Sequence, residues 1–139
     1  MGLTYADITL VNTGDEEMVS RGLLEPEQIR KVEVCAVVDS SVSRLVISDH
    51  LKNQLGLRVL HTTESELADG SCPQCEFVGP ISVYFKNRAS ICRAIMLPGT
   101  KEVLLGAIPI EDMDVIIDPV KQELALPPDR PYLPRVYIK

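Results

Sequence analysis

The chain has 139 residues, of which 45% are hydrophobic and 24% are charged, and its formal net charge is -6. This length suffices for one domain with a substantial core, so we expect a single domain over residues 1–139. The acidic balance, with Lys and Arg scattered along the chain, argues against a phosphate-binding surface and therefore against nucleic acid as a partner.

The N-terminal residues contain no targeting or anchoring signal. They lack the basic start and long apolar run of a secretion signal, and no later segment has the length needed to span a membrane. Ala6 stands where a myristoylation signal requires a hydroxyl residue. We therefore expect a cytoplasmic protein that does not contact membranes.

Two strands are predicted in the first part of the chain. Apolar and polar residues alternate over 5–11 and over 29–37, and the second run becomes continuously apolar towards its end. Such a change is typical of a strand that enters the core. The polar segment 13–28 between them contains two glycines and a proline, which predicts a connecting excursion with irregular structure or a short helical turn.

An acid followed by two hydroxyl residues, Asp39, Ser40 and Ser41, stands between two apolar runs that are typical of buried strands. Carboxylates are seldom buried unless they are paired or hydrogen-bonded. Asp39 is therefore either an exposed turn residue or an acid held in place for chemistry. Its position alone favours the turn.

A short helix is predicted over residues 48–57. Ser48 can cap its N-terminus, apolar residues recur four positions apart, and Gly56 can end it. Two strand-like runs follow, over 58–68 and 76–85.

Asp69 and Gly70 lie between these two runs, and this dipeptide predicts a hairpin. Cys72 and Cys75 follow at a spacing found in half of a zinc site or in a redox pair. The missing zinc ligands would have to come from Cys35, Cys92, His50 or His61. We expect two ordinary thiols and no metal, with a reversible disulfide as the alternative.

Short strands at close spacing continue along the rest of the chain. They are predicted over 91–97, 103–106, 114–118 and 123–126, with a helical turn around 110–113. This pattern implies an all-β barrel or sandwich. The tail 127–139 is rich in prolines, which lack the N–H donor that a central strand needs, and is expected to be an extended surface or interface segment.

Three landmarks occur in the order used by retropepsin-like aspartic peptidases, and the chain resembles the small single-domain members of that family found in prokaryotes. They are the Asp39 loop with its following strand and helix, the hairpin at 68–70, and the apolar segment Val103–Gly106 that in the family packs behind the catalytic loop. The chain departs from the family pattern at Ser41 and Val42, which replace Gly and Ala. The resemblance implies an all-β, closed barrel of retropepsin type with one or two short helices.

The resemblance also implies an aspartic-type endopeptidase whose active site forms across a homodimer. Two carboxylates would share a proton around one water, and because the chain has a single Asp loop, the second Asp39 would come from a twofold-related copy. The substrate would be a peptide or protein, and no cofactor is required. The implied catalytic residues are Asp39 and Ser40, and the implied substrate-binding residues are Ser41, Ala68, Asp69 and Gly70.

Ser41 leaves the activity open. The family glycine lets the loop approach its partner and the substrate closely, and a hydroxymethyl group there either obstructs the site or is accommodated by a shifted loop. The chain is therefore an active peptidase or a catalytically degenerate module that binds peptides or mediates interactions. A third possibility is a binding module whose hairpin is controlled by Cys72 and Cys75.

Overall fold

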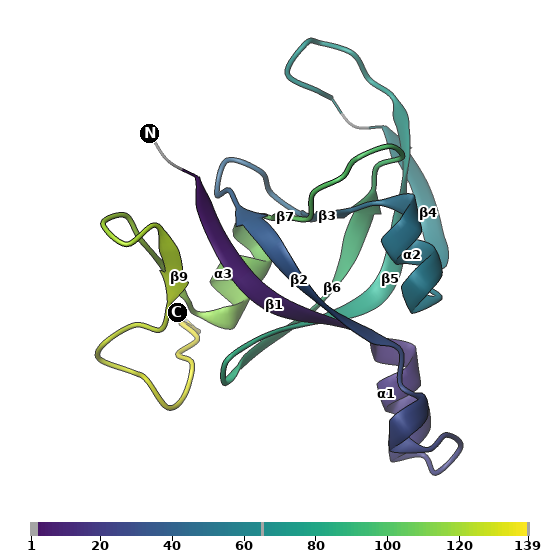
Figure 1. Cartoon of the computed structure of the whole chain (residues 1–139), viewed down its shortest axis with the longest axis horizontal. Helices are drawn as coiled ribbons and strands as arrows, with labels where there is room; N and C mark the ends of the chain where they lie inside the picture. Colours follow the sequence, from purple (N-terminus) through teal and green to yellow (C-terminus); the bar gives the residue numbers. More distant parts are fainter. Residues whose placement is uncertain (1–2, 65, 139) are drawn as a thin grey trace.

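A computed structural model describes residues 3–64 and 66–138 and shows a mainly β structure with short helices (Figure 1). The described part contains the strands β1 (Thr4–Asn12), β2 (Lys31–Val38), β3 (Leu45–Ile47), β4 (Arg58–Glu64), β5 (Gln74–Phe85), β6 (Arg88–Met96), β7 (Leu104–Leu105), β8 (Ile116–Asp118) and β9 (Glu123–Ala125). Its helices are α1 (Thr13–Ser20), α2 (Asp49–Leu55), α3 (Ala107–Met113) and the 3-10 turn η1 (Pro26–Gln28). None of the described helices is long and apolar enough to cross a membrane.

The strands pair in the order β4-β5-β6-β3-β7-β2-β1-β9-β8. β5 also pairs with β1 in antiparallel fashion, from Thr9 opposite Tyr84 to Asn12 opposite Ile81. This additional pairing links β5, β6, β3, β7, β2 and β1 into a ring of hydrogen-bonded neighbours. The fully buried core lies inside this ring and includes Leu10, Leu45, Ile47, Val78, Ile81, Val83 and Leu105.

β2 enters the core as its sequence predicts. Its first residues alternate between exposed and half-buried, whereas Ala36, Val37 and Val38 are all buried. The strand therefore delivers the next residue, Asp39, from the core to the molecular surface.

α2 has the ends predicted for it. The Ser48 side chain accepts a hydrogen bond from the Leu51 N–H, and Gly56 ends the helix in the left-handed conformation with φ 64°. A left-handed residue is costly for any side chain but glycine, which explains why the helix stops there.

The structure has three short α-helices where one or two were expected, and the additional one, α1, lies in the segment 13–28, for which the sequence left irregular structure or a short helical turn open. Its sequence is polar and lacks an apolar stripe, so periodicity gives no signal. Specific polar contacts stabilise it instead. Asn12 caps its N-terminus through Asp15 N–H, and the Arg30 side chain lies 2.9 Å from both Asp15 carboxylate oxygens and lowers the pKa of Asp15.

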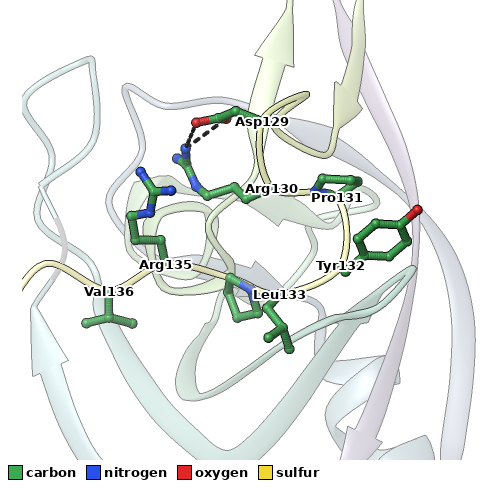
Figure 2. A pocket seen from close by; sticks show the side chains of 8 residues that line it. Asp129, Arg130, Pro131, Tyr132, Leu133, Arg135 and Val136 are labelled. Carbon is green, nitrogen blue, oxygen red and sulfur yellow. Dashed lines mark hydrogen bonds and ion pairs between the residues drawn. The ribbon is translucent and has the colours of Figure 1, made fainter.

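The C-terminal tail is extended and has no strand partner over its described residues. Asp114 anchors it by accepting hydrogen bonds from the Arg130 side chain at 2.6 and 2.9 Å and from the Arg135 N–H at 2.8 Å. Figure 2 shows Arg130 turned towards Asp129 within the loop 129–136, which lines a shallow hollow of about 510 Å³ at the surface. Residues 128–138 are mostly exposed, and the role of the tail as a surface or interface segment stays a prediction.

Candidate active site

Asp39 lies in a tight turn directly after β2. Its N–H donates to the Leu105 carbonyl at 3.0 Å, and its carbonyl accepts from the Val42 N–H at 3.1 Å, which closes the turn over Ser40 and Ser41. Asp39 is partly exposed and the two serines are exposed. The position therefore combines a backbone fixed to the core with a carboxylate that solvent or a partner molecule can reach.

The segment Val103–Gly106 packs behind this turn, as the sequence predicts. β7 pairs with β2 on one side and with β3 on the other. A Cβ atom at Gly106 would lie 2.4 Å from the Arg44 carbonyl oxygen and 2.5 Å from that of Val42. Only glycine fits at this distance, so its absence of a side chain sets the position of the loop.

The Asp39 carboxylate is held by Ser41 of its own chain. Asp39 Oδ1 accepts a hydrogen bond from the Ser41 hydroxyl at 2.6 Å and another from the Ser41 N–H at 3.0 Å. Both bonds stabilise the charged carboxylate and lower the pKa of Asp39 below its ordinary value. In a single chain, Asp39 is therefore an ionised group able to accept a proton.

The hairpin predicted around Asp69 and Gly70 is present as β4 and β5, which pair antiparallel. β4 ends at Glu64 and β5 begins at Gln74, so the connection is longer than predicted. Asp69 Oδ1 accepts hydrogen bonds from the Ser71 hydroxyl and N–H, the same arrangement as at Asp39. The hairpin tip and the Asp39 turn project from the same end of the molecule (Figure 1).

A pocket of about 580 Å³ lies between the loop after Asp39 and the hairpin. Its lining is mainly apolar and includes Val42, Val46, Leu67, Phe77, Ile95 and Leu104. Three charged side chains complete it, Arg44 from the loop and Glu64 and Glu66 from the hairpin. An apolar hollow with a few charged groups is typical of a ligand-binding site.

The pocket brings together only part of the predicted site. Ser41 and Ala68 line it, whereas Asp39 and Ser40 lie outside its lining and Asp69 and Gly70 are exposed at the hairpin tip. A single chain thus presents one carboxylate beside a pocket.

Of the residues that line this pocket, sequence reasoning named only Ser41 and Ala68, and two of those it missed, Arg44 and Phe77, bear most on the chemistry. Arg44 stands in the polar link before β3, where a charged residue is unremarkable, and Phe77 lies on a different strand. No local pattern predicts that the two side chains meet, because the contact depends on how β3 and β5 are placed by the sheet.

All four cysteines are free thiols. Cys72 is exposed at the hairpin and Cys75 is buried at the start of β5. Within residues 3–64 and 66–138, no group of three or more His, Cys, Asp or Glu side chains is placed to hold a metal ion.

The sequence matches no family model and no curated protein. Among solved structures, the chain is similar to the retroviral protease-like domain of Ddi1 from Leishmania major, with a TM-score of 0.58 and 15% identity over 92% of this chain and 90% of that one. The chain has a retropepsin-like fold. A retropepsin-like aspartic protease from Rickettsia conorii also matches, with a TM-score of 0.41 and 13% identity over 76% of this chain and 67% of that one.

In the retropepsin-like fold, landmarks that are separate in the sequence lie together in space. β2, β7 and β3 lie side by side, and they place Asp39, Gly106 and Arg44 at one edge of the sheet. At 15% identity the similarity concerns the fold alone.

Proposed function

We propose that this protein is an aspartic-type endopeptidase whose active site forms across a homodimer, each subunit contributing a retropepsin-type closed barrel and one Asp39. The main support is the Asp39 turn. Its backbone is hydrogen-bonded to β7, and it lies at the same end of the molecule as the pocket and the hairpin (Figure 1). Two Asp39 carboxylates around one water would act as base and acid in peptide hydrolysis.

Exposed apolar side chains beside the Asp39 turn support a twofold interface there. Leu3, directly before β1, is 58% exposed, and Tyr5, near the start of β1, is 45% exposed; this part of β1 pairs with the end of β2, which Asp39 follows. Ile108 is 41% exposed, and its N–H donates to the Ser43 carbonyl in the loop after Asp39. A second copy would cover these side chains and bring its own Asp39 to the axis.

The neighbouring residues have distinct roles in this proposal. The Ser40 hydroxyl is exposed and makes no hydrogen bond to any described residue, so it is free to bond to the partner's turn. The hairpin would act as a flap, with Ala68, Asp69 and Gly70 contacting the substrate and Ser41 lining the pocket from the opposite side. No cofactor or metal takes part.

Digestion of an unfolded protein or a peptide library between acidic and neutral pH tests the proposal. Because like charges at close distance cannot both ionise freely, the pair of carboxylates titrates as a unit and one pKa rises. Cleavage is expected to be fastest at acidic to mildly acidic pH. Absence of cleavage over the whole range would contradict the proposal.

A degenerate binding or interaction module is the second candidate, and the bond between Ser41 and Asp39 favours it. An oxygen that already accepts two hydrogen bonds within its own chain has less capacity to bind the attacking water. In that case the pocket would hold a peptide without cleaving it, and Asp39 would be a turn residue.

The variant Ser41→Ala separates the two candidates. It removes the hydroxyl bond to Asp39 and keeps the N–H bond, so the pKa of Asp39 is expected to rise towards its ordinary value. For a peptidase whose ionised Asp39 is the base, the acidic limb of the kcat/KM profile should then move to higher pH, because the base becomes protonated sooner as the pH falls. An unchanged or lower acidic limb would contradict this role for Ser41, and a module without activity would show no profile in either form.

A further inference from the structure

The pocket between the Asp39 loop and the hairpin contains one positively charged group, Arg44. Its guanidinium carbon lies 5.4 Å from the centroid of the Phe77 ring. Phe77 is only 8% exposed and belongs to β5, so the ring is a rigid platform for the cation. Stacking on an aromatic face orients a guanidinium and restricts its rotamers before any ligand arrives.

No described residue accepts a hydrogen bond from the side chain of Arg44. Within the described residues, its guanidinium takes part in no ion pair and no side-chain hydrogen bond. A guanidinium over an aromatic ring does not use its N–H groups in hydrogen bonds to that ring, and their fork matches the two oxygens of a carboxylate. Arg44 is therefore prepared to bind an anionic group that enters the pocket.

The position of the acidic side chains restricts where that anionic group can lie. Glu64 and Glu66 come from the hairpin, and both are exposed. Solvent and salt screen exposed carboxylates, so their repulsion of an anion acts only over a short distance. It therefore weakens the binding of an anion close to the hairpin more than that of an anion close to Arg44. The pocket thus offers an apolar interior with a positive group on the loop side and negative groups on the hairpin side.

We propose that Arg44 makes this pocket select peptides in which an Asp or Glu side chain lies near an apolar side chain that fills the pocket. The inference rests on the proposed function in so far as the ligand is a peptide held between the loop and the hairpin. In an extended peptide, residues two positions apart point to the same side, so the acidic residue lies two positions from the apolar one.

Binding of short fluorescent peptides to the Asp39→Asn protein tests the selectivity without hydrolysis. Each peptide carries one Leu and, two positions away on either side, Glu, Gln or Lys. We expect the Glu peptide in one of the two arrangements to bind about tenfold more tightly than its Gln counterpart, since a hydrogen bond to a charged group is typically worth that much. The Lys peptide should bind more weakly than the Gln peptide.

Substitutions of Arg44 in the same background identify its role. Arg44→Gln should abolish the difference between the Glu and Gln peptides, and Arg44→Glu should reverse the order of Glu and Lys. Arg93→Gln is the matched control, because Arg93 also stacks on Phe77, at 4.0 Å, but does not line the pocket. This control should keep the preference for Glu.

Three outcomes would overturn the inference: no peptide binds, the Glu and Gln peptides bind equally, or Arg44→Gln weakens all peptides by the same factor. The last result would mean that Arg44 supports the pocket without distinguishing between peptides. Cleavage by the wild-type protein is scored separately. Cleavage without a preference for Glu would contradict the inference and support the proposed function. A preference for Glu without cleavage would support the inference and contradict the proposed function.

Discussion

The variant Asp39→Asn should lose peptide hydrolysis by about a thousandfold, because it removes the group that takes and returns the proton at the reacting centre. The substitution keeps the size of the side chain and the oxygen that accepts from the Ser41 N–H, so the fold should be preserved. Initial rates of cleavage of an unfolded protein at acidic pH measure the effect.

A control for this variant is present in the chain. Asp69 Oδ1 accepts hydrogen bonds at 2.9 and 2.6 Å from the N–H and hydroxyl of Ser71, which closely reproduces the arrangement at Asp39. Asp69→Asn should therefore weaken the hydrogen bonds to Ser71 about as much as Asp39→Asn weakens those to Ser41, and reduce activity far less. If Asp39→Asn cleaves as fast as the wild type, Asp39 is a turn residue and the enzyme hypothesis is wrong.

The variant Gly106→Ala should destabilise the fold by about 3 kcal/mol, since an added methyl group would overpack the loop against immovable backbone. The new Cβ would lie 2.4 Å from the Arg44 carbonyl oxygen and 2.7 Å from the Arg44 nitrogen. The backbone φ of Gly106 is -93°, which any residue can adopt, so the effect comes from space and not from conformation. Urea unfolding followed by circular dichroism measures it.

Gly99→Ala is the comparison for this variant. Gly99 has φ +82° and no atom within 4 Å of an added Cβ, so the substitution should cost only about 1 kcal/mol of backbone strain. If Gly106→Ala costs no more than Gly99→Ala, the loop is not fixed by close approach to Gly106. The explanation given for the position of the Asp39 turn would then be wrong.

Local signals in the sequence predicted the elements that local physics determines. Ser48 and Gly56 mark both ends of α2 because a cap hydrogen bond and a left-handed residue act within one helical turn. The apolar end of β2 predicted its entry into the core for the same kind of reason. The dipeptide Asp69–Gly70 predicted the hairpin but not its length, since the strands stop where cross-strand pairing ends at Glu64 and Gln74.

Features that depend on distant contacts were not predictable. α1 is stabilised by the ion pair between Asp15 and Arg30, and Arg30 lies well beyond the end of the helix, after η1. The sequence of α1 itself shows no apolar stripe. Arg44 and Phe77 meet only because the sheet places β3 and β5 around one pocket. The bond from Ser41 to Asp39 is local, yet the sequence alone permitted either an obstructing or an accommodated side chain there.

The proposed shared site makes a quantitative prediction for mixed dimers. Wild-type and Asp39→Asn chains are unfolded together in denaturant, refolded at several ratios with total protein held constant, and assayed for cleavage. If each active site needs Asp39 from both subunits, activity should fall with the square of the wild-type fraction, so that an equimolar mixture retains about one quarter of the wild-type rate. A linear fall, with about one half retained at equimolar mixing, would show that each chain acts alone and would contradict an active site shared across the dimer.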